Sequence, residues 1–518
     1  MKKISDSMQM KAGVILSYTQ VAMNALTGLL YTPLMLRFMG QNEYGLYGTV
    51  SSAINMLGLL NLGFSSSYIR FFSQYKTKNE QSKINSFNAL FFIVFFVISV
   101  IAGIIGFFFA ANPVLLFDDG LSPEELSKSG IMLALLTVST ILGFLNTVVD
   151  CYVSANQRFI FLKSLSLISN VFNLAINVVV MYFGYGAVGL IVVSLAFNVL
   201  TRIITLIYAR RSLDFKFDFG HIEKRLFKSV LTFSGLIAIN MIVDQINSGI
   251  DKVLLGRFCG TAAVAVYSVG ASLNSHFTTF STAISGVFTP HIHNLVNSYE
   301  MDSKEQRNAL TNLFVKVGRI QYLLLALIAS GVVFFGRSFI YFWAGEGYDD
   351  SYVIALILII PSIIPLIQNV GIEIQRAENR HHYRAYIYGG MAVLNLAVSI
   401  ILCQFLEGIG AAIGTGLAVL LANGLIMNIV YHKKINIDII VFWKNILRQT
   451  AGMIIPFIVG TFIMIFADTG RSLVTLLLWI VLYTAVYLVC VWLFSMNGYE
   501  KELVLKALRK FLKVKNKA

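Results

Sequence analysis

The chain has 518 residues, of which 57% are hydrophobic and only 13% are charged. Soluble globular proteins carry about 25% charged residues, so one soluble core could not bury this apolar content. The composition therefore indicates lipid as the surrounding solvent. Segments 89–109 and 472–494 are continuously apolar for about twenty residues, enough for a helix to cross about 30 Å of hydrocarbon. The alternating strands of a membrane β-barrel are excluded by this continuity.

Fourteen apolar runs of this kind follow one another along the chain, and a basic amphipathic tail, 498–518, comes after them. The four cysteines lie far apart, in or beside these runs, so we expect neither a disulfide framework nor a metal site. The sequence contains no Walker A motif, and direct use of ATP is not expected. The runs lie near residues 12–36, 44–72, 86–110, 130–153, 161–183, 187–209, 228–255, 262–290, 312–335, 351–374, 383–405, 409–431, 446–467 and 472–495.

The basic residues give these helices an orientation. Fourteen alternating crossings place 33 of the 40 Lys and Arg residues on the side of both termini and five on the opposite side. Arg202 and Lys252 fall inside helices. Because loops on the cytoplasmic side are rich in Lys and Arg, both termini are predicted to be cytoplasmic, in a protein of the inner membrane. The net charge of +14 comes mainly from these loops and the tail. Membrane topology therefore explains it, and nucleic acid is not an expected partner.

The two halves of the chain share sequence at a nearly fixed offset. Arg37 and Gly40 match Arg257 and Gly260 at an offset of 220, and 13 of the 53 residues in 155–207 recur at an offset of 222. Each repeat holds six helices, so both copies enter the membrane in the same sense, as in transporters built from parallel repeats. The prediction is an all-α integral membrane fold with two parallel six-helix repeats around a central cavity. Its parts are an N-lobe, 1–215, a C-lobe, 216–435, two added helices, 436–497, and the tail.

Polar side chains form a stripe on the first predicted helix and a matching stripe on the seventh. Successive members are four, three and four residues apart, so each set occupies one narrow helix face. Carboxylates inside a membrane cost a few kcal/mol or more unless they face protein or water, so the stripes predict a hydrated cavity between the lobes. Serines of the eighth helix would add to it. The predicted cavity residues are Gln20, Asn24, Thr27, Tyr31, Asn240, Asp244, Asn247, Asp251, Lys252, Ser272 and Ser275.

These polar residues also have structural interpretations. Serine and threonine often hydrogen-bond neighbouring helices in membranes, and Lys252 could simply neutralise a nearby acid. Four arginines are candidate diphosphate contacts because a guanidinium forms a fork that matches phosphate oxygens. Their alternative role is to anchor helix ends among lipid head groups. They are Arg37 and Arg257 at the outer helix ends, and Arg70 and Arg202 near the cytoplasmic ends.

Several short motifs stand out in the two halves of the chain. They contain Thr32, Pro33, Arg37 and Gly40, then Glu43, Tyr44, Gly45 and Tyr47, then Asn61, Gly63 and Phe64, and in the second half Asp251, Gly256 and Tyr267. These motifs resemble those of a known family, the Wzx-type flippases of polysaccharide biosynthesis. The similarity covers essentially the whole chain and implies the fold of the multidrug/oligosaccharidyl-lipid/polysaccharide superfamily, with two six-helix lobes around a central cavity and, in some members, two extra helices. Cavities in this family often carry basic residues, whereas the clearest charges here are Asp244 and Asp251.

The resemblance implies transport of undecaprenyl-diphosphate-linked oligosaccharide from the inner to the outer leaflet, for O-antigen, capsule or exopolysaccharide synthesis. We expect no enzymatic activity and no cofactor, with coupling to H⁺ or Na⁺ through Asp244 or Asp251. Expected partners are the polyprenyl-linked oligosaccharide and membrane lipids, with polysaccharide polymerase and glycosyltransferases as further candidates. The alternatives are a lipid II flippase, a multidrug/cation antiporter and a non-transporting scaffold.

Overall fold

The computed structural model contains only helices as regular elements in the part of the chain that it describes. Nine helices of that part are long and apolar enough to cross a membrane, which confirms the all-α membrane class. The count of fourteen crossings stays a prediction. The described part is residues 6–515 without 79, 118–119, 221–229, 231–233, 235–240, 242–244, 246–248, 287 and 379.

The chain divides into two compact units, each of which is described by itself. The first contains Met1–Ser268 and Ser399–Ala411, and the second contains Val269–Val398 and Ala412–Ala518. The lobe boundaries predicted from the repeat, and the cavity predicted between the lobes, stay predictions.

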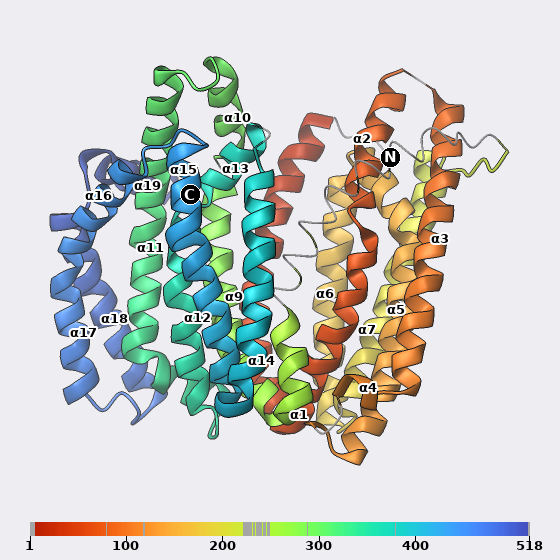
Figure 1. The fold of residues 1–518 in the computed structure, drawn as a ribbon, viewed down its shortest axis with the longest axis horizontal. Helices are drawn as coiled ribbons and strands as arrows, with labels where there is room; N and C mark the ends of the chain where they lie inside the picture. The colour runs from red at the N-terminus through yellow and green to blue at the C-terminus, as the bar shows by residue number, and fades with distance from the viewer. Residues whose placement is uncertain are drawn as a thin grey trace. The chain divides into compact units, whose positions relative to one another are not determined.

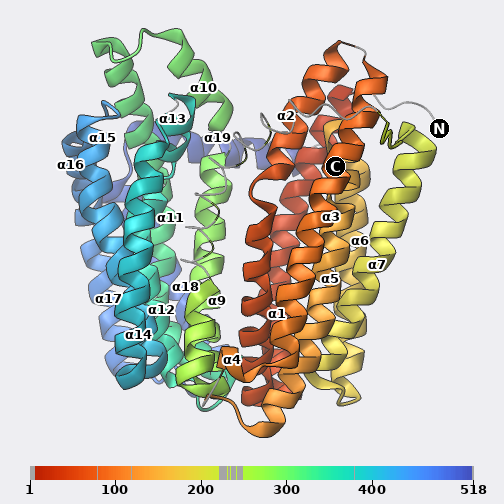
Figure 2. The same ribbon diagram turned by 45° about the vertical axis from the view of Figure 1, so that its right-hand side comes forward.

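In the first unit, α5 packs between α3 and α7, and α1 packs against α6 (Figures 1 and 2). A capping box starts α5: the Ser122 hydroxyl accepts from the Glu125 amide, and the Glu125 carboxylate accepts from the Ser122 amide. The elements are α1 (Asp6–Leu57), η1 (Gly58–Asn61), α2 (Phe64–Thr77), α3 (Gln81–Ala111), α4 (Val114–Phe117), α5 (Pro123–Ala155), α6 (Phe159–Tyr182) and α7 (Gly186–Leu213).

The long helix α1 contains the first predicted membrane helix and the beginning of the second, up to Leu57. The two parts meet at Gly40, where the backbone turns with a φ of 77°. The matching glycine of the repeat, Gly260, has a φ of 86°. Glycine adopts this left-handed region without a steric penalty, so both copies of the motif place a glycine at a sharp turn between helices.

Aromatic side chains form much of the core of the first unit. Tyr68 is fully buried, and its ring lies 5.1 Å from those of Phe87 and Phe91. Its hydroxyl donates to the Asn88 side-chain oxygen at 2.5 Å. The abundant phenylalanines therefore pack the helices together, and the phenol is satisfied inside the core.

The second unit is built around α11, which contacts α12, α16, α17 and α18. Side chains of Ser303, Asp438 and Ser472 cap the starts of α11, α16 and α18. Its elements are α9 (Gly260–Gly286, which begins in the first unit), α10 (Thr289–Ser298), α11 (Lys304–Ala344), α12 (Asp349–Ile367), α13 (Val370–Ala377), α14 (His382–Val419), η3 (Leu420–Ile426), α15 (Met427–Lys433), α16 (Ile439–Thr450), η4 (Ala451–Met453), α17 (Ile454–Phe466), α18 (Leu473–Cys490), η5 (Val491–Ser495) and α19 (Gly498–Lys515).

The predicted amphipathic tail forms the helix α19, whose first turn is anchored in the second unit. Glu500 is 4% exposed and accepts two hydrogen bonds from Arg319 of α11, at 2.6 Å from Nε and 2.9 Å from Nη2. The guanidinium also donates to the carbonyl oxygens of Asn445 and Ser495. A buried charge pair of this kind tolerates little movement, because losing either partner leaves an uncompensated ion.

Candidate functional site

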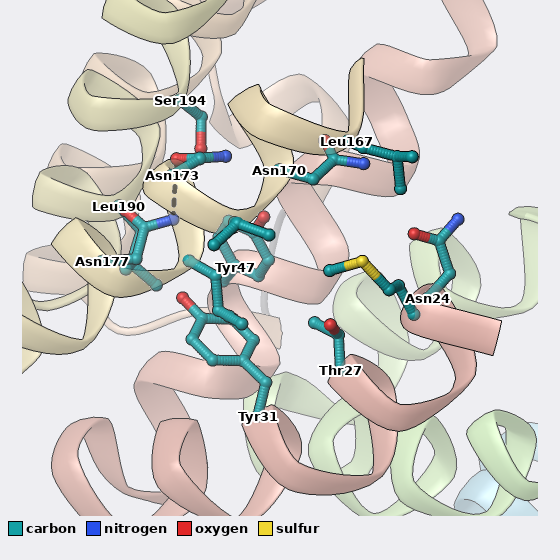
Figure 3. A pocket seen from close by; sticks show the side chains of 13 residues that line it. Asn24, Thr27, Tyr31, Tyr47, Leu167, Asn170, Asn173, Asn177, Leu190 and Ser194 are labelled. Carbon is teal, nitrogen blue, oxygen red and sulfur yellow. Dashed lines mark hydrogen bonds between the residues drawn. The ribbon is translucent and has the colours of Figure 1, made fainter. Parts of the chain in front are cut away.

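A cavity of about 290 Å³ opens in the first unit among α1, α6 and α7 (Figure 3). Its position follows from the packing of α1 against α6, with α7 beside both. Most of its polar groups are amides and hydroxyls. The lining residues are Met23, Asn24, Thr27, Tyr31, Tyr47, Leu167, Asn170, Val171, Asn173, Leu174, Asn177, Leu190 and Ser194.

Three asparagines of α6 dominate one wall of this cavity. Asn170, Asn173 and Asn177 are three and four residues apart, so they lie on one helix face. The Asn177 amide nitrogen donates to the Asn173 side-chain oxygen at 3.1 Å, as the dashed line in Figure 3 shows. That bond holds two of the three amides in a fixed relation while the Asn170 side chain stays exposed to the cavity.

Two buried polar atoms at the cavity, the Tyr31 hydroxyl and the Asn177 side-chain oxygen, have no partner at hydrogen-bond distance among the described residues, although the two side chains lie close enough to interact with each other. Figure 3 shows both side chains at the cavity. A buried polar group without a partner costs about 1–3 kcal/mol, so such atoms are rare in folded proteins. The wall therefore holds hydrogen-bonding capacity that the described residues do not fully use. None of the residues that line this cavity is ionised at neutral pH.

The stripe predicted on the first helix largely lines this cavity. Asn24, Thr27 and Tyr31 belong to its wall. Gln20 does not: its amide nitrogen donates to the Ser166 hydroxyl at 2.9 Å, and its oxygen accepts from the Lys163 ammonium at 3.2 Å. Gln20 therefore joins α1 to α6, one turn beyond the cavity.

The stripe predicted on the seventh helix is only partly visible, because Asn240, Asp244 and Asn247 lie outside the described residues. Asp251 is 4% exposed, and its carboxylate accepts a hydrogen bond from the Tyr267 hydroxyl at 2.5 Å. Lys252 follows it and is half-buried. Neither residue lines the cavity of the first unit.

The predicted serines of the eighth helix lie on α9 and do not gather at the cavity. The Ser272 hydroxyl donates to the Val269 carbonyl oxygen of its own helix at 2.8 Å. Ser275 is exposed. The Ser272 hydroxyl can therefore be satisfied by the preceding turn of its own helix. The place of both serines in a cavity between the lobes stays a prediction.

The four candidate diphosphate arginines are dispersed, and none of them lines the cavity. Arg37 and Arg70 are exposed. Arg257 donates to the Leu115 carbonyl oxygen at 3.2 Å, and Arg202 donates to that of Ser139 at 2.8 Å. Their roles in binding diphosphate stay predictions.

Sequence reasoning missed the second wall of the cavity. It did not single out Asn170, Asn173, Asn177, Tyr47 or Ser194 as site residues. The signal was present, because the three asparagines have the same helical spacing as the stripe on α1. What the sequence could not supply is that the two stripes face each other.

The fold is that of known membrane transporters. The structure entitled "Lipid II flippase MurJ, inward closed conformation" superposes with a TM-score of 0.72 and 16% identity, over 95% of this chain and all of that one. An inward-facing multidrug resistance MATE family transporter of the MOP superfamily superposes with a TM-score of 0.54 and 14% identity, over 76% of this chain and 92% of that one. The chain therefore has the multi-pass helical membrane fold of these proteins.

The family follows from sequence comparison. The family model described as "Polysaccharide biosynthesis protein" matches residues 34–353, more than half of the chain. The chain belongs to this family. A candidate O-antigen transporter of Shigella flexneri is 21% identical over 406 residues, which cover 77% of this chain and 91% of that protein. The resemblance to Wzx-type flippases is thus confirmed.

Proposed function

We propose that this chain moves an undecaprenyl-diphosphate-linked oligosaccharide from the cytoplasmic to the outer leaflet of the inner membrane, for O-antigen, capsule or exopolysaccharide synthesis. Both termini lie in the cytoplasm in this proposal, as the distribution of Lys and Arg favours. The saccharide binds in the cavity of the first unit while the polyprenyl chain stays in lipid. Family membership and the likeness to the candidate O-antigen transporter support this proposal.

The observation that carries the proposal is the chemistry of the cavity wall. Sugar hydroxyls donate and accept hydrogen bonds, and an amide side chain offers both functions at neutral charge. The Tyr31 hydroxyl and Asn177 oxygen would each gain a partner from a saccharide. A site for cationic drugs would instead be expected to place a carboxylate in the wall, and the described residues of this wall include none. The wall therefore favours a saccharide over the substrates of a multidrug/cation antiporter.

Coupling to H⁺ or Na⁺ is assigned to the second stripe. Asp251 is the described carboxylate of that stripe, buried and hydrogen-bonded by Tyr267. Buried acids inside membrane proteins commonly serve ion or proton transfer. In this proposal Asp251, together with Asp244, takes up the coupling cation, and the diphosphate meets one or more of the four candidate arginines.

The test uses a strain depleted of the chromosomal protein and complemented with variants. Without the protein, we expect one polyprenyl-linked oligosaccharide to accumulate, accessible only from the cytoplasmic face. The double substitution Asn173→Leu and Asn177→Leu should leave that accumulation uncorrected, because the wall loses two of its four amides while the apolar packing is kept. Ser272→Ala is the matched control and should restore surface glycan.

Three outcomes would contradict the proposal. Accumulation of lipid II with cell lysis would indicate a lipid II flippase, and drug hypersensitivity without any lipid-linked intermediate would indicate an antiporter. Full complementation by the double variant, at a normal protein level in the membrane, would show that the cavity does not bind the saccharide.

A further inference from the structure

A second, mostly apolar groove of about 350 Å³ lies in the first unit along α3, α5 and α7. It shares no lining residue with the polar cavity. Two arginines, Arg202 and Arg210, stand among its apolar side chains, and neither lines the polar cavity, although Arg202 is also one of the four candidate diphosphate contacts. The groove is lined by Phe92, Leu142, Leu145, Asn146, Val149, Val199, Arg202, Ile203, Leu206, Arg210 and Phe217.

The two arginines project from α7, eight residues apart, and therefore lie on the same side of the helix. Arg202 donates to the Ser139 carbonyl oxygen at 2.8 Å. Its guanidinium reaches α5 because residue 143 is a glycine, where an added Cβ would lie 3.0 Å from Arg202 Nη2. Arg210 is exposed in the last turn of α7 and has no partner among the described residues.

The end of the groove near Arg210 is fixed by the segment that follows α7. The Asn88 amide donates to the Lys216 carbonyl oxygen at 3.0 Å, and the Asp218 amide donates to that of Asn85 at 3.1 Å. These bonds hold Phe217 against Phe92 of α3, with ring centroids 5.0 Å apart. The groove therefore has an aromatic end wall beside the exposed side chain of Arg210.

We propose that this groove binds one anionic membrane phospholipid. Its phosphate contacts Arg210 and Arg202, and an acyl chain lies along the aliphatic residues of α5 and α7. Charge complementarity carries the choice of ligand: the arginines match a phosphate, and the remaining wall matches a hydrocarbon chain. Asp150, the acid near Arg202, already accepts from the Asn146 amide at 3.0 Å. It lowers the positive charge of the site but leaves Arg210 available.

The polyprenyl-linked saccharide fits this groove less well than a phospholipid. Asn146 is the one amide among the described residues of its wall, and it already donates to Asp150, so this wall offers sugar groups far fewer hydrogen-bonding partners than the polar cavity does. Arg210 also lies near the end of α7, on the side that the distribution of Lys and Arg makes cytoplasmic, where anionic lipids are abundant. The inference is independent of the proposed transport activity.

The test measures lipid binding to the purified full-length protein in mild detergent. Native mass spectrometry and thermal stability are recorded with phosphatidylglycerol and, separately, with phosphatidylcholine. We expect phosphatidylglycerol to bind and to raise the Tm, and Arg210→Gln to weaken its binding about tenfold, the change expected for one lost charge-assisted contact. Arg211→Gln is the matched control, since the neighbouring Arg211 is exposed but does not line the groove.

A second variant, Leu145→Trp, fills the apolar part of the groove and keeps both arginines. It should also reduce phosphatidylglycerol binding, whereas a purely electrostatic surface would be unaffected. Equal losses from Arg210→Gln and Arg211→Gln would overturn the proposal, as would equal binding of phosphatidylcholine. Displacement of phosphatidylglycerol by an equimolar polyprenyl phosphate would assign the groove to the transported lipid instead.

Discussion

Two helices of this protein carry polar stripes that look alike in sequence, but the structure treats them differently. On α1, Asn24, Thr27 and Tyr31 line a cavity. On α9, Ser272 bonds the Val269 carbonyl oxygen, and Thr279 bonds that of Ser275. The first stripe leaves hydrogen-bonding groups available to a ligand. In the second, Ser272 and Thr279 already donate to carbonyl oxygens of their own helix.

The difference lies in what each side chain can reach. A serine or threonine hydroxyl can fold back to the carbonyl oxygen of the preceding turn, so the hydroxyls of a helix need no cavity. An asparagine has two donors and an acceptor, and a tyrosine carries its hydroxyl far from its own backbone. Both need partners elsewhere. When a neighbouring helix supplies them they join helices, as Gln321 does by donating to Ser281. When none does and a cavity lies beside them, they are candidates for binding a ligand.

The largest effect is expected from replacing a cavity amide by a hydroxyl. Asn173→Ser should lower the transport rate about tenfold or more, because the shorter side chain can bond its own helix and leaves the cavity. Asn173→Gln should retain more activity, since it keeps the amide. The measurement is the rate at which labelled lipid-linked oligosaccharide becomes accessible in the opposite leaflet of vesicles. If the serine variant proves as active as the wild type, the amide has no role in binding.

A smaller effect is expected on stability, from the buried residue Glu378. It tests whether a buried polar group without a hydrogen bond must belong to a ligand site. Glu378 lies just after α13, outside the membrane-spanning segments. Neither of its carboxylate oxygens has a hydrogen bond among the described residues, and its Oε2 lies 3.6 Å from Arg380 Nη1. Burial, opposed by Arg380, raises the pKa of Glu378 from 4.5 to about 7. The folded protein therefore holds this proton more tightly than the unfolded chain, so stability falls as the pH rises from about 4.5 to above 7.

Glu378→Gln removes this dependence. At pH 8 the variant should be more stable than the wild type by about 1–3 kcal/mol, and the difference should shrink as the pH approaches 4.5. Thermal unfolding in detergent between pH 5 and 8 measures it. A constant difference over that range would mean that Glu378 does not titrate there. Unchanged transport would show that an unsatisfied buried group need not be a binding group.

The smallest effect should come from the stripe on α9. Ser272→Ala together with Thr279→Ala removes two hydroxyls that donate within the helix, so stability should change by less than about 0.5 kcal/mol. Transport should be indistinguishable from that of the wild type when both are compared at equal protein level. Loss of transport in this double variant would place α9 at the substrate path and end the distinction between the two stripes.

The sequence predicted the membrane class and the family, because hydrophobic run length and short motifs are local properties. It also placed Asn24, Thr27 and Tyr31 on a shared face, which helical periodicity guarantees. It could not show that Asn170 and Asn177 of α6 face them, since this depends on how α1 packs against α6. Nor could it distinguish Gln20, which bonds Ser166, from its neighbours one turn away. Helical periodicity shows which residues share a face of α1, but only the packing of the helices shows which residues that face contacts.

The ion pair between Arg319 and Glu500 has a consequence for the order of events during synthesis. The two residues are 181 positions apart, so Arg319 is made long before its partner. Until α19 is made, carbonyl oxygens are the only acceptors that Arg319 has in the described part of this unit. A buried charge without its counterion costs about 3–5 kcal/mol. The second unit is therefore completed late, and a nascent chain that stops before residue 500 leaves α11 with an unneutralised cation.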